Sequence, residues 1–281
     1  MKRFLRLGVW VLGSLTLVLL LLLWGNKPFE TRDAFAVIKE RFEEKNILLE
    51  AHNYSTRTGK VYYVIAGKPS SKTLLLIHGS PGDWTAWKQL LMETSLVEKY
   101  RIILVDRPPY QASTAAGGNL RKQSDALKIL METECHPCTL VGHSYGGALA
   151  LQLAVDFPQN THAVVTLAGT IASNYQAPKW YNTLAQNSWI TPFLTDGLQA
   201  SNQEMLTLSQ NLDALSYPLS TLDIPFYFLQ GGVDVLVDSR SPFTLLPHLN
   251  NAEISFNSTW DHFVIWTALP TVEEFIERAN R

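Results

Sequence analysis

The chain has little charge for its length, and neither sign dominates. Charged residues make up 17% of its 281 positions, and the formal net charge is −2. Proteins that bind nucleic acid usually carry a basic surface, so the composition gives no support for a nucleic-acid partner. Apolar residues make up 46% of the chain, which is typical of a folded globular protein and not of a disordered one.

Cysteine is also scarce. Its two copies, Cys135 and Cys138, stand in one Cys-His-Pro-Cys sequence. A structural zinc site needs two further ligands, and the chain has no second cysteine pair to supply them. The pair precedes a predicted strand, whereas a redox dithiol of the thioredoxin type opens a helix. We therefore predict a loop disulfide formed in an oxidising compartment, with buried free thiols and a redox pair as the alternatives.

The N-terminus contains the one long apolar run. Basic residues at positions 2, 3 and 6 precede residues 7–24, which carry no charge. As a helix this run would be about 27 Å long, enough to cross a thin bilayer. The basic flank favours a cytoplasmic N-terminus. We predict a transmembrane signal-anchor over residues 1–25, with the remaining chain on the periplasmic or extracellular side. A cleaved signal peptide and a soluble hydrophobic helix are the alternatives.

Residues 26–46 are expected to form a linker and an amphipathic helix. Further along, β-rich segments at 47–52 and 61–65 predict a hairpin, and short apolar strands then alternate with helices. Such alternation predicts a parallel sheet that is buried on both faces. It stops over about residues 170–222, which we interpret as a cap inserted into the domain. A last helix is predicted over 263–279. The aromatic residues of the insertion are expected to form a small core and in part to line an acyl pocket.

The most informative motif is Gly-His-Ser-Tyr-Gly at 142–146. It lies between a predicted strand at 139–141 and a predicted helix at 146–155. In this context the G-x-S-x-G pattern is typical of a nucleophile elbow, a tight turn that presents Ser144 to a cleft. A serine hydroxyl needs a histidine base, and the histidine needs a carboxylate that orients it.

Two acidic and two basic candidates follow Ser144 in the chain. Asp234 comes shortly after the strand predicted at 224–229, and His262 follows the strand predicted at 252–256. The order Ser, Asp, His at successive strand ends favours these two residues over Asp238 and His248. We predict Ser144, Asp234 and His262 as the catalytic residues.

An oxyanion hole is predicted beside the serine. The sequence His-Gly-Ser-Pro-Gly at 78–82 directly follows the strand predicted at 73–77. Its glycines let the backbone approach an oxyanion, and the amides of Ser80 and Tyr145 are the expected donors. His78 is expected to order this loop, His143 to be packed rather than catalytic, and Asp106 and Arg107 to be structural.

Together these motifs resemble the alpha/beta-hydrolase-fold serine hydrolases over about residues 47–281. The resemblance rests on the motifs at 78–82 and 142–147, on Val-Asp-Arg-Pro-Pro-Tyr at 105–110, and on Gly-Gly-Val-Asp at 231–234 and Asp-His-Phe at 261–263. It implies an eight-stranded, mostly parallel sheet with helices on both faces, a small helical cap, and no metal or organic cofactor. A serine nucleophile argues against the epoxide hydrolase and haloalkane dehalogenase branches, which use aspartate. The family often has glycine where this chain has Pro109 and Gln111.

The sequence therefore predicts a membrane-anchored serine hydrolase that acts on a small-molecule acyl substrate, an ester, thioester or amide. An aminopeptidase or acyltransferase of the same fold is an alternative, and Glu204 or Asp213 could then bind a substrate amine. A non-catalytic scaffold is the second alternative.

Overall fold

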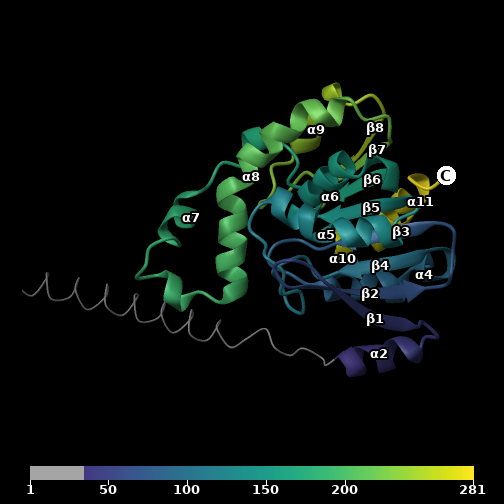
Figure 1. Cartoon of the computed structure of the whole chain (residues 1–281). Helices are drawn as coiled ribbons and strands as arrows, with labels where there is room; N and C mark the ends of the chain where they lie inside the picture. Colours follow the sequence, from purple (N-terminus) through teal and green to yellow (C-terminus); the bar gives the residue numbers. More distant parts are fainter. Residues whose placement is uncertain (1–34) are drawn as a thin grey trace, which may run out of the picture.

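The computed structural model describes residues 35–281, and an eight-stranded sheet runs through their centre (Figure 1). The strand order is β1-β2-β4-β3-β5-β6-β7-β8. All neighbours from β4 to β8 pair in parallel, whereas β2 pairs antiparallel with β1 and β4. The strands span Leu49–Ser55 (β1), Lys60–Gly67 (β2), Thr73–Ile77 (β3), Arg101–Val105 (β4), Cys138–His143 (β5), Thr161–Leu167 (β6), Phe226–Gly231 (β7) and Ala252–Asn257 (β8).

Helices cover both faces of the sheet, as the alternation of apolar segments predicts. Their bounds are Phe35–Glu43 (α2), Lys88–Glu93 (α3), Leu96–Lys99 (α4), Leu120–Glu134 (α5), Tyr145–Asp156 (α6), Trp180–Leu184 (α7), Asp196–Ser220 (α8), Ser241–Leu245 (α9), Val264–Thr267 (α10) and Leu269–Arg278 (α11). The sheet separates two apolar cores. Leu74 and Leu76 of β3 face one core, and Leu75 and Ile77 face the other, because successive side chains of a strand point to opposite faces. The predicted fold is therefore confirmed.

The last helix differs from the prediction. It is divided into α10 and α11, with Ala268 between them. Pro270 stands in the first turn of α11, where its missing N–H costs nothing, but it could not continue a helix from α10. The sequence contains this signal, and the prediction of one continuous helix was wrong.

The segment between β6 and β7 extends away from the sheet (Figure 1). It holds the short helix α7, two 3₁₀ turns at Ser173–Tyr175 and Thr191–Phe193, and the 25-residue helix α8. Thr195 caps α8 by accepting a hydrogen bond from the Leu198 amide. One side of the C-terminal half of α8 is buried through Leu208, Leu212, Leu215 and Leu219, which join the core that also contains α5 and α6.

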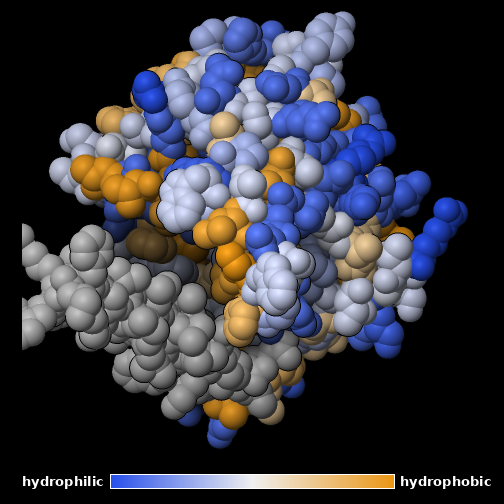
Figure 2. Space-filling view, turned by 90° about the vertical axis from the view of Figure 1, so that its left-hand side faces the viewer, coloured by the Kyte–Doolittle hydropathy of each residue, from blue (hydrophilic) through white to orange (hydrophobic). Residues whose placement is uncertain are grey.

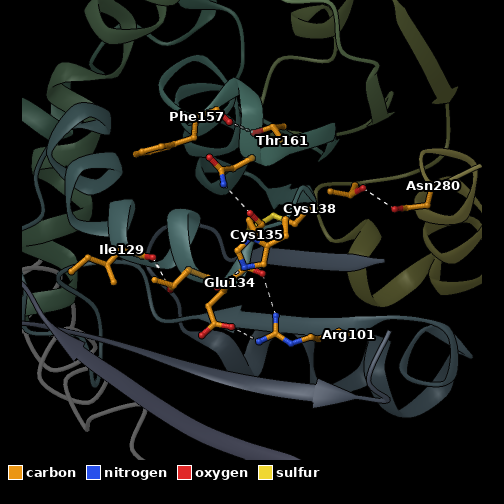
Figure 3. The surroundings of a disulfide bond; sticks show 12 residues. Arg101, Ile129, Glu134, Cys135, Cys138, Phe157, Thr161 and Asn280 are labelled. Atoms are coloured by element: carbon orange, nitrogen blue, oxygen red, sulfur yellow. Dashed lines mark hydrogen bonds and ion pairs between the residues drawn. A yellow bond between two sulfur atoms is a disulfide. The ribbon is translucent and has the colours of Figure 1, made fainter. Parts of the chain in front are cut away.

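Cys135 and Cys138 form a disulfide between the end of α5 and the start of β5 (Figure 3). Both residues are fully buried. The carbonyl of Cys135 also accepts a hydrogen bond of 2.8 Å from the Asn160 side chain. The predicted loop disulfide is confirmed, and both cysteines of the chain are used in it.

The predicted anchor at 1–25 and residues 26–34 of the linker lie outside the described residues. Helix α2 follows, and it buries Ile38 and Phe42 against the domain. No helix within residues 35–281 combines the length and the apolar character that a membrane crossing requires.

Candidate active site

Ser144 lies in a tight turn between β5 and α6, and its backbone is strained. Its φ of 53° and ψ of −123° are rare for a residue with a side chain. The flanking glycines make this turn possible. A Cβ on Gly142 would lie 2.2 Å from the Gly146 carbonyl oxygen, and a Cβ on Gly146 would lie 2.1 Å from that of Ile77. The motif therefore needs glycine on both sides because neighbouring backbone fills the space.

Asp234 and His262 are brought together from the loops that follow β7 and β8. His262 Nδ1 lies 2.9 Å from Asp234 Oδ2, and both side chains are almost fully buried. The other carboxylate oxygen, Oδ1, accepts hydrogen bonds from the amides of Leu236 and Val237 at 2.9 and 2.8 Å. Burial alone would raise the pKa of Asp234, but the hydrogen bonds from His262 and from these two amides outweigh it and lower the pKa. The carboxylate is therefore ionised at neutral pH.

Ser144 and His262 line one cavity of 360 Å³. The cap supplies most of its wall through residues of α7, α8 and the segments before and between them, and Leu236 and Val237 add the loop after β7. His143 packs behind the site, with its ring centroid 4.9 Å from that of His262 and its Nε2 3.0 Å from the His262 carbonyl. Burial, followed by the nearby His262, lowers the pKa of His143 to about 4, so this ring is neutral at pH 7.

The segment 78–82 lies directly against the serine. A Cβ on Gly79 would be 3.1 Å from Ser144 Cβ, and Ser80 lines the same cavity as Ser144. Tyr145 is the first residue of α6, and the first amides of a helix have no acceptor within the helix. The amides of Ser80 and Tyr145 thus stay candidates for an oxyanion hole.

Hydrogen bonds of the His78 and Arg107 side chains fix the backbone of this segment, and both residues are fully buried. His78 Nε2 accepts a hydrogen bond of 2.9 Å from the Arg107 amide, so its proton lies on Nδ1, which donates to the Gly79 carbonyl at 2.7 Å. Burial and the adjacent Arg107 charge keep the pKa of His78 well below its ordinary value. The Asp106 carboxylate accepts hydrogen bonds from the amides of Trp84 and Ala112. These residues have the structural roles that the sequence suggested.

The rival candidates lie elsewhere. Asp238 pairs with Arg240 at 2.7 Å, and His248 lines a separate groove of 410 Å³ together with Asp213. Glu204 is fully buried and accepts four hydrogen bonds from protein groups. Neither Glu204 nor Asp213 lines the cavity that contains Ser144, so the structure gives no support to the suggestion that one of them binds a substrate amine.

The aromatic residues of the cap do not form the small core that the sequence predicted. Figure 2 looks onto the cap side of the molecule and shows apolar side chains gathered at its surface. Trp180 and Trp189 are 76% and 83% exposed, and Phe193 is 53% exposed. Only Tyr175 and Tyr181 among the cap aromatics line the cavity. Trp180, Trp189 and Phe193 therefore lie at the surface of the cap and do not line the cavity.

Sequence reasoning missed Gln123 and Ser201, which contact Glu204 and Ser80. It gave no role to Tyr110, the last residue of the motif at 105–110, which also contacts Glu204. No short motif marks Gln123 or Ser201, and α5 and α8 come together only in the fold. Among residues 35–281 no group of three or more histidine, cysteine, aspartate or glutamate side chains could hold a metal ion.

Comparisons with known proteins agree with this architecture. The sequence profile described as alpha/beta hydrolase fold matches residues 72–227, which is more than half of the chain. The chain belongs to the alpha/beta hydrolase fold family.

The curated relatives match only in part. The chain is 31% identical to Epoxide hydrolase 4 of Mus musculus over 105 residues, 36% of this chain and 29% of that protein. It is 31% identical to the Pimeloyl-[acyl-carrier protein] methyl ester esterase of Aeromonas hydrophila over 100 residues, 34% of this chain and 37% of that protein. The matched segments thus span well under half of these relatives.

Solved structures resemble the whole domain at low identity. A putative lipase from Acinetobacter baumannii superposes with a TM-score of 0.66 at 19% identity, covering 87% of this chain and 96% of its own. A protein described as a membrane phospholipase A gives a TM-score of 0.66 at 17% identity and covers all of both chains. These likenesses support the fold.

Proposed function

We propose that the chain is a serine hydrolase that cleaves a carboxylic ester through Ser144, His262 and Asp234. The observation that carries the proposal is the buried Asp234–His262 pair at the cavity that also contains Ser144. With its proton on Nδ1 facing the carboxylate, the neutral His262 ring has a free lone pair on Nε2, which is what a general base needs.

The proposed reaction uses these residues in two halves, acylation and deacylation. Ser144 Oγ attacks the ester carbonyl while His262 Nε2 takes the hydroxyl proton, and the amides of Ser80 and Tyr145 donate to the oxyanion. His262 returns the proton to the leaving alcohol as the carbon–oxygen bond breaks, which leaves an acyl group on Ser144. Water, deprotonated by His262, then releases the acid and restores the serine. Asp234 orients the His262 ring and stabilises its charged form in both acylation and deacylation.

The cavity favours an ester over the amine-bearing substrate of an aminopeptidase. Its lining combines apolar residues with amides, hydroxyls and the one lysine Lys179, and no carboxylate contributes to it among the described residues. A cationic amine would therefore lack a partner. Relatives named as an esterase, a lipase and a membrane phospholipase A are in keeping with an acyl ester as the substrate. An epoxide substrate is less well supported, because the elbow carries serine where the epoxide hydrolases are expected to have aspartate.

We further propose that residues 1–25 anchor the protein and that the domain lies outside the cytoplasm. The basic residues before the apolar run and the Cys135–Cys138 disulfide support this location. Protease added to intact cells should degrade the domain. Degradation only after lysis would contradict the proposed topology.

A fluorophosphonate probe and a soluble p-nitrophenyl ester test the enzymatic proposal. The folded wild-type protein should be labelled and should hydrolyse the ester, and Ser144→Ala should lose both properties. Ser173→Ala is a matched control, because it removes a cap hydroxyl that does not line the cavity. Labelling that persists in Ser144→Ala would refute the nucleophile assignment, and an unlabelled wild type would favour a non-catalytic scaffold.

A further inference from the structure

The carboxylate of Glu204 connects the cap to the segment that holds Ser80. Glu204 lies on α8 and is fully buried. Its Oε1 accepts hydrogen bonds from Arg107 Nη1 and Gln123 Nε2, each at 2.7 Å. Its Oε2 accepts from the hydroxyls of Ser80 and Tyr110 at 2.5 and 2.8 Å. A buried carboxylate with four donors is fully satisfied, so it has no capacity left for a ligand.

The four donors come from three separate parts of the sheet domain. Ser80 follows β3, Arg107 and Tyr110 follow β4, and Gln123 lies on α5. Glu204 therefore fixes α8 of the cap to the end of the sheet where Ser144 lies. Ser201, one turn earlier on α8, adds a contact of 2.9 Å to the Ser80 hydroxyl.

Arg107 links Glu204 to the backbone of His78 and Gly79, which lies beside Ser144. Its Nε donates to the His78 carbonyl at 2.8 Å, and its Nη2 donates to the Gly79 carbonyl at 2.9 Å. The Gly79–Ser80 peptide is trans and planar, so the Ser80 N–H points away from the Gly79 carbonyl. Fixing that carbonyl therefore also fixes the direction of the Ser80 N–H.

We propose that Glu204 is a positioning residue that aims the Ser80 amide at the oxyanion, so that α8 of the cap contributes to catalysis. Glu204 acts on this peptide from two sides, through the Ser80 hydroxyl and through Arg107. The proposal rests on the proposed serine hydrolase function. It assigns to Glu204 a role in the transition state rather than in substrate binding.

Two variants test separately the connection of Glu204 through the Ser80 hydroxyl and its connection through Arg107. Ser80→Ala removes the hydroxyl that binds Glu204 but keeps the backbone amide and the buried Arg107–Glu204 pair. Glu204→Gln keeps the shape of the side chain and removes its charge, which weakens the hold of Arg107 on the Gly79 carbonyl. Loss of one oxyanion donor typically lowers kcat by about 10²-fold or more, so partial misalignment should lower kcat by about 10- to 100-fold. KM for a soluble p-nitrophenyl ester should change by less than about threefold, because the ground state does not depend on this amide.

A boronic acid that forms a tetrahedral adduct with serine provides a readout that a merely structural role would not change. In the full-length protein its affinity should fall by the same factor as kcat/KM in both variants. Ser80→Thr, which keeps the hydroxyl, should restore both values. Ser209→Ala is the matched control, because it removes a hydroxyl of α8 that binds the Ser173 carbonyl at 3.1 Å, and it should behave as wild type.

Boronate affinity within twofold of wild type in Ser80→Ala would overturn the proposal, and so would a rise in KM at constant kcat. If Glu204→Gln does not fold, Ser80→Ala decides alone, since it leaves the buried ion pair intact. Absence of ester hydrolysis and of Ser144 labelling in the wild type would instead defeat the proposed function, and this proposal with it.

Discussion

His262 Nδ1 lies 2.9 Å from Asp234 Oδ2, and this contact decides which nitrogen of the ring can act as a base. An ionised carboxylate only accepts hydrogen bonds, so the proton of the neutral ring lies on Nδ1. The lowered pKa of Asp234 keeps the carboxylate ionised. Its contribution to stability should be complete above its unfolded pKa of about 3.9 and should be lost as the pH falls through the lower folded value.

Asp234→Asn should therefore reduce kcat by about 10⁴-fold on a p-nitrophenyl ester, because an amide donor at this place favours the wrong ring tautomer. Asp238→Asn provides the control and should stay within about twofold of wild type. Asp238 forms a partly exposed pair with Arg240, and such pairs contribute little. If Asp238→Asn is the inactive variant, the acid has been assigned to the wrong residue.

The sequence predicts the sheet and the positions of the site residues through short local signals. The apolar segments mark strands that are buried on both faces, and Ser144 stands in a five-residue motif whose glycines meet neighbouring backbone. Asp234 and His262 could be chosen because the order of strands fixes which loops share one end of the sheet.

The partners of Glu204 could not be predicted in this way. Arg107 lies 97 residues before it, and Gln123 lies 81 residues before it. Nothing in the local sequence says that a helix of the cap will bury a carboxylate against them. The exposed aromatics of the cap were missed for a similar reason, because exposure depends on how an irregular segment packs and not on periodicity.

Gly146→Ala should destabilise the protein, whereas Gly197→Ala should not. The added Cβ at position 146 would lie 2.1 Å from the Ile77 carbonyl oxygen, which forces the backbone to move. We expect a loss of about 3 kcal/mol in the free energy of unfolding. At position 197, in the first turn of α8, the atom nearest to an added Cβ is 4.0 Å away. Alanine there should raise the free energy of unfolding by up to about 1 kcal/mol. Urea unfolding of both variants provides the measurement, and equal effects would contradict the space argument.

The stability of the protein should fall as the pH drops from about 6.5 to about 4, in part through His143. Its folded pKa is about 4, below the unfolded value of about 6.5, so the unfolded chain binds a proton that the folded state does not. The stabilisation is complete above the unfolded pKa and declines by about 1.4 kcal/mol per pH unit as the pH falls toward the folded pKa.

His143→Gln tests this assignment. Its amide can still donate to the His262 carbonyl, but it cannot titrate. The slope of the unfolding free energy against pH should therefore decrease between pH 6 and 4.5, by the amount that corresponds to nearly one bound proton. An unchanged slope in urea titrations across this range would show that other groups, such as the buried His78, account for the acid sensitivity.

Lys179 should give the enzyme a preference for esters that carry a negative charge. It is the one lysine or arginine among the described residues that line the cavity, and no carboxylate lines it. An anionic group on the substrate could pair with the lysine, and at about 4 Å an exposed charge pair is worth about fivefold in affinity.

The test compares a neutral p-nitrophenyl butyrate with a p-nitrophenyl hemiglutarate, which differs mainly by its terminal carboxylate. Lys179→Met should lower kcat/KM for the anionic ester by about fivefold and leave the neutral ester nearly unchanged. Added salt should reduce the preference of the wild type in the same direction, because the lysine is exposed to solvent. Lys128→Met, which removes an exposed lysine of α5 paired with Glu132, should have no effect on either ester. A ratio of the two esters that is the same in Lys179→Met and wild type would mean that the charge at the cavity does not select the substrate.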